Sequence, residues 1–355
     1  MNANRRMDAI SALHDDPARC AEIAGLRHVP ADEPGIRRVR RGRGFSYVDA
    51  WGRPVSDGQV ARIADLAIPP AWRDVWICAD EQGHLLATGE DDRGRKQYLY
   101  HPRWRELRDL LNFYRLVVFA EGLPRIRAHV SAQLRRRTLD RDRVLAAMLR
   151  IIDASAMRVG SEVYAEDNDS FGLTTLGKRH VRVLADGVEF SFPAKSGRRV
   201  RVSLADRAVA RVIRELLRYR GRLLFAVDGQ AVDAAEVNAL LAELTGEHVT
   251  AKDFRTWSGT LAAFCYLREQ VDSERAPERI TVSAIDQAAE VLGNTRTVAR
   301  AHYVHPHMLE AFTNKRFDEY LDACTIRRSD FMDGDECALL AFLRVLLERE
   351  FDQLT

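Results

Sequence analysis

Residues 171–204 read FGLTTLGKRHVRVLADGVEFSFPAKSGRRVRVSL and contain the strongest fold signal in the chain. Within them, FGLTTL, HVRVLA, VEFSFPAK and RRVRVSL alternate apolar and polar residues, as strands with one buried face do. The dipeptides Asp186-Gly187 and Ser196-Gly197 separate the later segments and favour tight hairpin turns. The stretch therefore predicts a small antiparallel sheet.

Helical patterns surround this predicted sheet. Apolar residues recur at helical spacing over residues 104–120, 140–157 and 206–220. Gly221 is placed to end the last of these helices. Two pairs with capping-box spacing predict the starts of two more helices, namely Asp233 with Glu236 and Thr250 with Asp253. Residues 105–355 are therefore predicted to be mainly α, with the β interlude at about 171–204.

The N-terminal part has a different character. Between residues 35 and 101, short aromatic and β-branched runs lie near Gly-rich breaks, which is typical of strands. One helix is expected over residues 57–68. It should end there because Pro69 and Pro70 cannot continue a helix. The fold class is therefore α+β: a small, mainly β domain over residues 1–104, a boundary near residues 102–106, and a larger, mainly α domain.

Composition is that of a soluble globular protein, with 46% hydrophobic and 30% charged residues among 355. No apolar run approaches the length of a membrane-spanning helix, so a cytoplasmic location without a membrane partner is expected. The five cysteines are scattered and form no C-x-x-C pair, which suggests neither a disulfide framework nor a zinc site.

The net charge is only +2, because 54 basic residues face 52 acidic ones. Their distribution is uneven, since acids gather at residues 330–335 and 348–352 while basic residues cluster elsewhere. The basic clusters are RRVRRGR at 37–43, RGRKQYLYHPRWR at 93–105, RRRTLDRDR at 135–143 and RRVR at 198–201. One basic face toward nucleic-acid phosphate would produce this pattern. Solvated helix faces are the alternative for each cluster.

Common catalytic signatures are absent from the sequence. It contains no G-x-x-x-x-G-K-[ST] loop, no G-x-G-x-x-G after a strand, no H-E-x-x-H and no G-x-S-x-G. Nucleotide hydrolysis and zinc proteolysis are therefore not expected.

Four residues in distinctive contexts could carry chemistry instead. Arg158 follows an apolar helix and precedes Gly160, Lys195 precedes the Ser196-Gly197 turn, Arg255 lies in the first turns of a helix, and Tyr303 lies in a basic helix three residues before Pro306. Each also has an ordinary structural explanation. Arg158 could be a charge at a helix C-terminus, and Lys195 could keep a turn soluble. Arg255 could form an ion pair with Asp253, and Tyr303 could be a packing residue.

Together the four residues suit attack on a phosphodiester. Two guanidinium groups can stabilise the extra negative charge of the transition state without a metal. A lysine can protonate the leaving oxygen, and a covalent tyrosine adduct conserves bond energy, so resealing needs no ATP. No cofactor is expected. His302, His305 and His307 could suggest a metal site, but they crowd Pro306 and lack a carboxylate partner.

Three segments resemble the type IB DNA topoisomerases, in particular their small bacterial and poxvirus-like branch. They are RVGSEVYAEDNDSFGLTTLGKRHV from 158, KDFRTWSGT from 252 and LGNTRTVARAHYVHP from 292. In the N-terminal part, GRGFSYVDAWGRPV, IPPAWRDVWI and GRKQYLYHPRWRE are similar to the DNA-clamping domain of that family. The resemblance covers about residues 35–320 and implies the catalytic core shared by tyrosine recombinases and type IB topoisomerases.

The resemblance implies a catalytic set of Arg158, Lys195, Arg255, Asn294 and Tyr303. Asn294 stands where poxvirus enzymes have His, and its amide can donate a hydrogen bond but no proton. Gln97, Tyr98 and Tyr100 match candidate DNA contacts. The implied activity is relaxation of supercoiled duplex DNA by a monomeric clamp, through a 3′-phosphotyrosyl intermediate and strand rotation.

Two other functions stay open at this point. A tyrosine site-specific recombinase would use the same chemistry, but such enzymes usually have His three residues before the second arginine, where this chain has Lys252, and an all-helical N-terminal domain. An inactive DNA clamp would not need to keep every polar catalytic residue. Lys252 and the strands of the N-terminal part favour the topoisomerase over the recombinase. The retained polar residues favour it over the inactive clamp.

Overall fold

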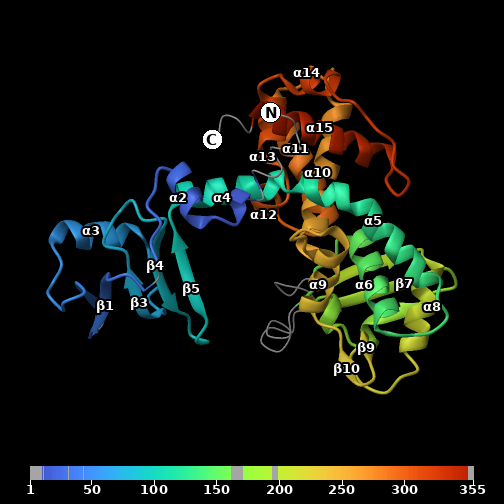
Figure 1. Ribbon diagram of the computed structural model, residues 1–355, viewed down its shortest axis with the longest axis horizontal. Coiled ribbons are helices and arrows are strands. Elements are labelled where there is room, and N and C mark those ends of the chain that lie inside the picture. Colours follow the sequence, from blue (N-terminus) through green and yellow to red (C-terminus); the bar gives the residue numbers. More distant parts are fainter. Residues whose placement is uncertain are drawn as a thin grey trace. The chain divides into compact units, whose positions relative to one another are not determined.

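The computed structural model describes residues 10, 12–30, 32–42, 44–160, 171–193 and 199–350. The chain forms two compact units, of which the first ends at Asn112 and the second covers Phe113–Glu350. Helix α4 (Pro102–Tyr114) contains this boundary and also the one expected near residues 102–106. Both units combine helices with antiparallel sheets, which confirms the α+β class (Figure 1).

The first unit is built on a five-stranded antiparallel sheet with the order β2-β1-β3-β4-β5 (Figure 1). Its strands are β1 (Ile36–Arg41), β2 (Gly44–Val48), β3 (Arg73–Ile77), β4 (Leu85–Glu90) and β5 (Lys96–Tyr100). A short helix, α2 (Pro17–Ile23), precedes the sheet.

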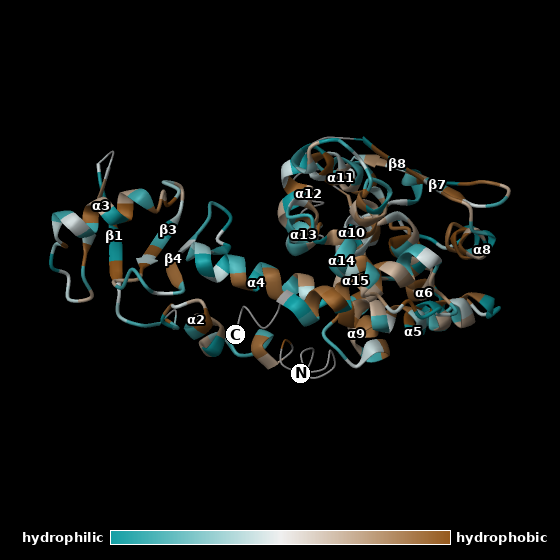
Figure 2. Cartoon of the chain, turned by 90° about the horizontal axis from the view of Figure 1, so that it is seen from above, coloured by the Kyte–Doolittle hydropathy of each residue, from teal (hydrophilic) through white to brown (hydrophobic). Residues whose placement is uncertain are grey.

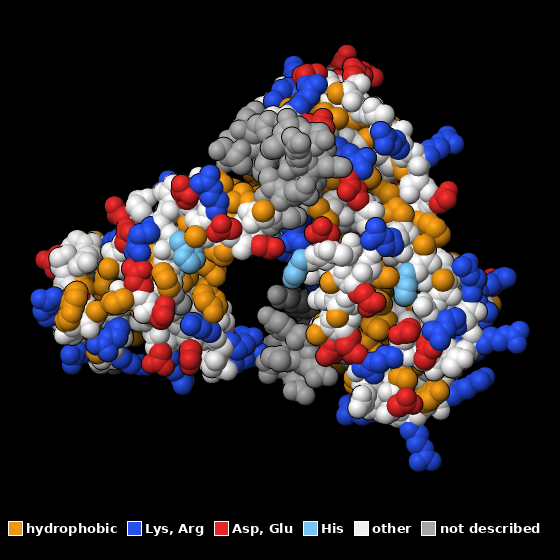
Figure 3. All heavy atoms as spheres, viewed as in Figure 1, with side chains coloured by type: hydrophobic (Ala, Val, Ile, Leu, Met, Phe, Trp, Pro, Cys, Tyr) orange, Lys and Arg blue, Asp and Glu red, His pale blue; other side chains and the backbone are white. Residues whose placement is uncertain are grey.

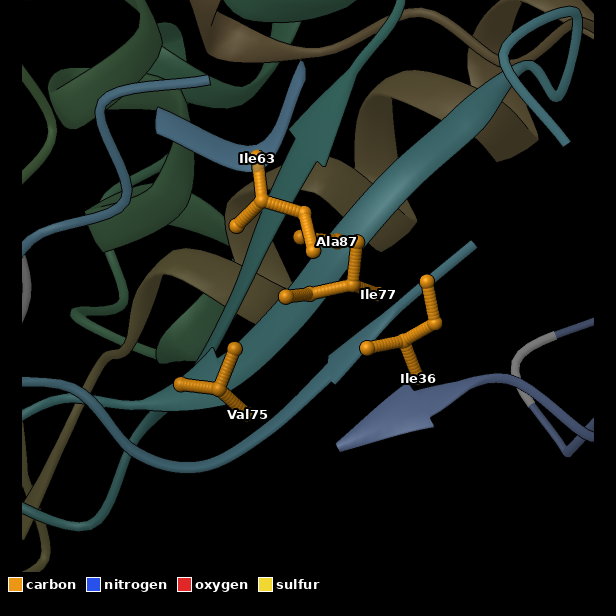
Figure 4. Close-up of a cluster of buried hydrophobic side chains, with 5 residues drawn as sticks. All are labelled: Ile36, Ile63, Val75, Ile77 and Ala87. Carbon is orange, nitrogen blue, oxygen red and sulfur yellow. The ribbon is translucent and has the colours of Figure 1, made fainter. Parts of the chain in front are cut away.

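Helix α3 (Asp57–Asp65) supplies one residue to the core of this unit. A capping box between Ser56 and Gln59 starts the helix, which ends before the two prolines as expected. Its buried Ile63 packs with side chains of β1, β3 and β4 (Figure 4). The cluster is Ile36, Ile63, Val75, Ile77 and Ala87. Helix α4 carries both hydrophilic and hydrophobic residues along its length (Figure 2).

His84 is a buried polar residue of the first unit and is only 6% exposed. Its Nδ1 accepts a hydrogen bond of 3.0 Å from the backbone N–H of Val29. The His28 ring stacks on it at 4.7 Å, and Trp104 meets it edge-on at 4.4 Å. Since Nδ1 serves as an acceptor, the fold requires the neutral form of His84.

Acid is therefore expected to destabilise the first unit through His84. Burial, and secondarily the charge of His28, lowers the pKa of His84 from 6.5 to about 4. Because the unfolded chain binds this proton more tightly, the stabilisation is complete above pH ~6.5 and is lost as the pH falls toward ~4, by up to about 3 kcal/mol. Urea unfolding at about pH 7 and about pH 4.5 measures the loss.

The matched control is His84→Asn, because an amide oxygen can accept the Val29 N–H without titrating. This variant should lose the part of the pH dependence that lies between the folded and unfolded pKa values of His84. An identical pH dependence in the two proteins would contradict the assignment.

The second unit is mainly helical, and its first helices carry its core. Buried positions recur along α5 at helical spacing, whereas α6 is buried on nearly all sides over residues 143–152. The helices are α5 (Leu116–Arg135), α6 (Arg141–Ser155), α8 (Arg207–Leu216), α9 (Ala234–Thr245), α10 (Ala251–Glu269), α11 (Pro277–Leu292), α12 (Arg296–His302), α13 (Pro306–Thr313), α14 (Phe317–Asp322) and α15 (Gly334–Glu350). Both predicted capping boxes are present, at the starts of α9 and α10.

The predicted small sheet is confirmed, with three strands in the order β6-β7-β8. They are β6 (Val181–Val183), β7 (Val188–Pro193) and β8 (Arg199–Leu204), and β9 (Ala226–Val227) pairs with β10 (Gln230–Ala231) in a separate hairpin. At the β6–β7 turn, a Cβ on Gly187 would lie 2.0 Å from the Leu204 carbonyl oxygen, so only glycine fits beside β8.

Two local predictions for the segments on either side of the small sheet were wrong. FGLTTL is not a strand but contains a 3-10 turn, η1 (Leu173–Thr175), because the Thr175 hydroxyl exchanges hydrogen bonds with the backbone of Gly172. Helix α8 ends at Leu216 rather than at Gly221, and the Tyr219 N–H donates to the Leu216 carbonyl in a tighter turn. A second 3-10 turn, η2 (Lys178–His180), leads into β6.

A partly buried ionic network joins four helices of the second unit. Arg127 on α5 donates to both oxygens of Asp153 on α6, at 2.8 and 2.9 Å, and to both oxygens of Glu336 on α15, at 2.7 Å each. The indole N–H of Trp257 on α10 also donates to Glu336, at 3.2 Å. The network ties α10, which carries Arg255, to the rest of the unit. No helix in the described ranges is long and apolar enough to cross a membrane.

Candidate active site

Helix α10 places Arg255 in the interior of the second unit. Thr250 and Asp253 form its capping box, in which Asp253 accepts from the Thr250 backbone N–H at 2.7 Å and from its hydroxyl at 2.9 Å. The Asp253 carboxylate is therefore used in the helix cap. The alternative ion pair between Asp253 and Arg255 is not present. Arg255 is 5% exposed and instead donates to the carbonyl of Ala156 and, at 3.1 Å, to that of Leu292.

These carbonyls belong to the C-terminal ends of α6 and α11, so Arg255 satisfies two helix ends at once. The two bonds use one N–H on each of its terminal nitrogens, out of five N–H groups in a guanidinium. Arg255 is therefore fixed by the protein and keeps donors for an anionic ligand.

Arg158 follows directly after α6, as predicted. The helix ends through Ala156 in a left-handed conformation (φ 49°). The backbone then lies against residues 172–174, with Leu173 N–H donating to the Arg158 carbonyl at 2.9 Å. Gly160 and Gly172 make this approach possible, since a Cβ on Gly172 would lie 2.4 Å from the Gly160 Cα. The close backbone contact fixes the position of Arg158.

Asn294 contacts the same arginine from another segment. Gly293, with φ 61°, ends α11, and Asn294 N–H donates to Ala289 at 2.9 Å. The Arg158 guanidinium donates to the Asn294 side-chain oxygen. The Asn294 amide nitrogen is buried and has no hydrogen-bond acceptor among the residues that the structure describes. It is a donor available for a further oxygen.

Tyr303 lies immediately after α12, as its C-cap, and not inside the helix as the sequence suggested. The residue leaves the helix with φ −138° and ψ −2°, ahead of Pro306 at the start of α13. The Arg255 guanidinium carbon lies 5.0 Å from the centre of its ring. The phenol of Tyr303 and the side chain of Arg255 are thus neighbours.

The electrostatic surroundings of Tyr303 favour its ionised form. Burial alone would raise the pKa of the phenol, but a hydrogen bond from Arg255 and its positive charge outweigh that effect. Smaller contributions come from Arg158 and Lys252, and the net result is a pKa below the usual value of 10.0. A tyrosine with this shift is a better nucleophile near neutral pH than an ordinary one.

Arg158, Arg255 and Tyr303 line one pocket of about 360 Å³. Its other lining residues are Val159, Ala234, Asn238, Thr250, Ala251 and Lys252. Lys252 was not among the catalytic residues predicted from the sequence, although its position three residues before Arg255 puts both on one side of α10. The arrangement places positive charge and N–H donors around a phenol, as binding of a phosphodiester requires.

The structure leaves one predicted catalytic residue untested. Lys195 lies between β7 and β8 in the sequence, outside the residues that the structure describes. Of the three histidines, His305 is fully buried, and burial and the charge of His307 hold its pKa well below 6.5. Within the described ranges, no group of three His, Cys, Asp or Glu residues could hold a metal ion.

The candidate DNA contacts of the first unit lie on both faces of β5. Tyr98 is 47% exposed and stacks on Tyr100, with ring centres 5.9 Å apart, and the Lys96 ammonium lies 5.7 Å from the Tyr98 ring. These three residues alternate along the strand and share one face. Gln97 faces the other way, and its amide donates to Asp91 at 3.0 Å.

Some of the basic residues in the sequence clusters form ion pairs within the protein. In the cluster at 135–143, Arg136 pairs with Asp140, Arg141 with Glu236 and Arg143 with Glu215. The pairs of Arg141 and Arg143 join α6 to α9 and α8, and the pair of Arg136 lies between the end of α5 and the start of α6, so these three arginines are not a free basic patch. Figure 3 accordingly shows Lys and Arg side chains beside Asp and Glu over the visible face of the second unit.

Comparison with known proteins identifies both parts of the chain. Residues 101–324 match the family model of the eukaryotic DNA topoisomerase I catalytic core, and residues 44–91 match that of the bacterial DNA topoisomerase IB N-terminal domain. The chain is 30% identical to DNA topoisomerase 1B of Acanthamoeba polyphaga mimivirus over 295 residues, which cover 79% of this chain and 88% of the relative.

Poxvirus proteins are more distant relatives. DNA topoisomerase I of Monkeypox virus and DNA topoisomerase 1B of Vaccinia virus (strain Copenhagen) are each 22% identical over 292 residues, covering 77% of this chain and 88% of each relative. The family models and the viral relative at 30% identity agree with the resemblance seen in the sequence. The chain belongs to the type IB DNA topoisomerase family.

Proposed function

We propose that this protein relaxes supercoiled duplex DNA by cutting one strand, allowing it to rotate and resealing it, with Tyr303 as the nucleophile. The observation that carries the proposal is the meeting of Tyr303, Arg255 and Arg158, from three separate segments, around one pocket. Family membership and the lowered pKa of Tyr303 support it further.

In the proposed reaction the phenol gives up its proton to solvent water, and its oxygen attacks the phosphorus. An Oη–P bond forms, the bond from phosphorus to the 5′ oxygen breaks, and a 3′-phosphotyrosyl adduct results. Arg255 and Arg158 stabilise the developing negative charge with guanidinium N–H donors. The adduct conserves the energy of the broken bond, so the 5′ oxygen can reseal the strand without ATP.

Two residues take supporting roles in this scheme. Asn294 donates its free amide N–H to a non-bridging phosphate oxygen, while its own oxygen orients Arg158. Lys195 protonates the departing 5′ oxygen, an assignment that rests on the family resemblance alone. A substrate with a sulfur leaving group needs little protonation and should restore the cleavage rate of Lys195→Ala. Equal impairment on both substrates would remove Lys195 from this role.

The first unit contributes binding in this proposal. Tyr98 and Tyr100 present an aromatic face next to Lys96, which suits contact with bases and phosphates, and Gln97 is a weaker candidate because Asp91 already holds its amide. The protein would act as a monomer that closes around duplex DNA, on chromosomal DNA in the cytoplasm.

The test is relaxation of supercoiled plasmid by the purified protein in EDTA without ATP, followed by detergent trapping. We expect full relaxation and DNA attached to protein through a 3′ phosphate, because the scheme uses neither a metal nor a nucleotide. Binding without relaxation or capture would contradict the proposal and leave an inactive clamp. Recombinant products in place of relaxed circles would indicate a site-specific recombinase.

A further inference from the structure

Helix α10 approaches the backbone of Tyr303 at Gly259. A Cβ built on Gly259 would lie 2.7 Å from the Tyr303 carbonyl oxygen, 3.1 Å from the Tyr303 Cβ and 2.9 Å from the Leu292 Cδ1. Real Cβ atoms essentially never come closer than 3.0 Å to such neighbours. Glycine is disfavoured in the interior of a helix, and Gly259 lies in the middle of α10. The close approach of Tyr303 to α10 therefore explains why residue 259 is a glycine.

The next residue binds the same carbonyl group. The Thr260 hydroxyl donates to the Tyr303 carbonyl oxygen at 3.1 Å, and Thr260 is 0% exposed. On its other side, the Tyr303 N–H donates to Ala299 at 3.0 Å. Both backbone polar groups of Tyr303 are thus held, although the residue lies outside any helix. Its position depends on α10 as well as on α12.

The same helix also holds the arginine that lies over the Tyr303 ring. Arg255 and Gly259 are four residues apart, so they share one face of α10. One turn of helix therefore fixes both the guanidinium and the backbone of the tyrosine, and with them the 5.0 Å spacing between guanidinium and ring. A displacement of about 1 Å at reacting atoms can lower a rate by about 10²-fold.

We infer that Gly259 and Thr260 are positioning residues for the nucleophile. Through the main-chain carbonyl of Tyr303 they set where the phenol stands relative to Arg255 and to the pocket. The inference rests on the proposed function, in which Tyr303 attacks the phosphodiester. It assigns to both residues a role in the rate of cleavage and none in the binding of DNA.

The variants that test it are Gly259→Ala, Thr260→Val and Thr260→Ser. Alanine forces α10 and Tyr303 apart, valine removes the hydroxyl with little change of shape, and serine keeps the hydroxyl. Two matched controls are Gly58→Ala, a helical glycine with open space around its Cβ position, and Ser258→Ala, whose hydroxyl bonds within α10 to Phe254. Single-turnover formation of the covalent adduct on a short duplex measures the effect.

We expect Gly259→Ala to slow adduct formation by about 10²-fold and Thr260→Val by about tenfold. Thr260→Ser and both controls should react at the wild-type rate, and every variant should bind the duplex with unchanged Kd. The rise of the rate with pH should also move to higher pH in Gly259→Ala. The reason is that a phenol displaced from Arg255, Arg158 and Lys252 loses the positive charges that lower its pKa.

The possible failures are distinguishable. Wild-type rates and an unchanged pH profile in both Gly259→Ala and Thr260→Val would overturn the inference and leave the proposed function intact. Should Gly259→Ala fail to fold, the comparison of Thr260→Val with Thr260→Ser decides the question, and equal rates in that pair would overturn it. An unreactive wild-type protein would instead overturn the proposed function and this inference together.

Discussion

Tyr303→Phe is expected to abolish both relaxation and covalent capture of DNA. The substitution removes one oxygen atom and leaves the ring beneath the Arg255 guanidinium, so the pocket keeps its shape and charge. Without the phenol no bond to phosphorus can form, and loss of a nucleophile lowers rates by roughly 10⁴-fold or more. Plasmid relaxation with detergent trapping measures the loss, while Kd for a duplex should stay within about twofold of wild type.

The matched control is Tyr266→Phe. Tyr266 is also on α10, and hydrogen bonds from Ser283 and Arg275 lower its pKa in the same direction. It does not line the pocket, so loss of its hydroxyl should leave relaxation unchanged. Covalent capture by Tyr303→Phe would show that another residue attacks the DNA, and equal losses in the two variants would point to a general effect on folding.

The sequence predicted several elements of the second unit that local chemistry determines. The capping boxes at Asp233 and Thr250 and the turn at Asp186-Gly187 depend on residues within a few positions of one another. Prediction failed for FGLTTL, where the Thr175 hydroxyl bonds to the Gly172 backbone and tertiary contacts also compete with the alternating pattern. FGLTTL alternates like a strand, but its Leu173 and Thr174 N–H groups donate to the carbonyls of Arg158 and Val159. Its backbone reaches β7 at one end, where Phe171 N–H donates to Pro193.

The candidate site shows the same division. Residue types and the family resemblance pointed to Arg158, Arg255 and Tyr303, which do meet in one pocket. The partners of Arg255 could not be read locally, because its carbonyl acceptors are 99 and 37 residues away in the sequence. The glycine in WSGT went unused as a signal, although a glycine inside a helix often marks a close approach.

Charge clusters were the least informative part of the sequence. Arginines at 135–143 looked available for DNA, yet three of them pair with acids that are distant in the sequence or lie in the same turn. By contrast, Arg255, in a segment without a basic cluster, sits at the centre of the candidate site. Local charge density therefore did not indicate which arginines line the candidate site, whereas tertiary position does.

The second large effect is expected from Arg255→Lys, which should slow covalent cleavage by about 10²- to 10³-fold. The planar guanidinium donates to the Ala156 and Leu292 carbonyls while it also faces the Tyr303 ring. A lysine ammonium is a point charge on a flexible chain and cannot satisfy two separate helix ends and a phosphate together. Single-turnover cleavage of a duplex measures the rate, and thermal melting measures any loss of stability.

The matched control for this variant is Arg268→Lys, on the same helix. Arg268 pairs with Asp335 at 2.6 Å and lies over the Phe264 ring, so it tests the loss of a guanidinium that stacks on an aromatic ring away from the pocket. It should cleave at the wild-type rate. A near-normal rate in Arg255→Lys together with a lowered melting temperature would reduce Arg255 to a structural link between α6 and α11. A slow rate in a stably folded variant, with the pH profile moved upward as Tyr303 loses its neighbouring charge, would instead establish Arg255 as the group that both activates the phenol and stabilises the transition state.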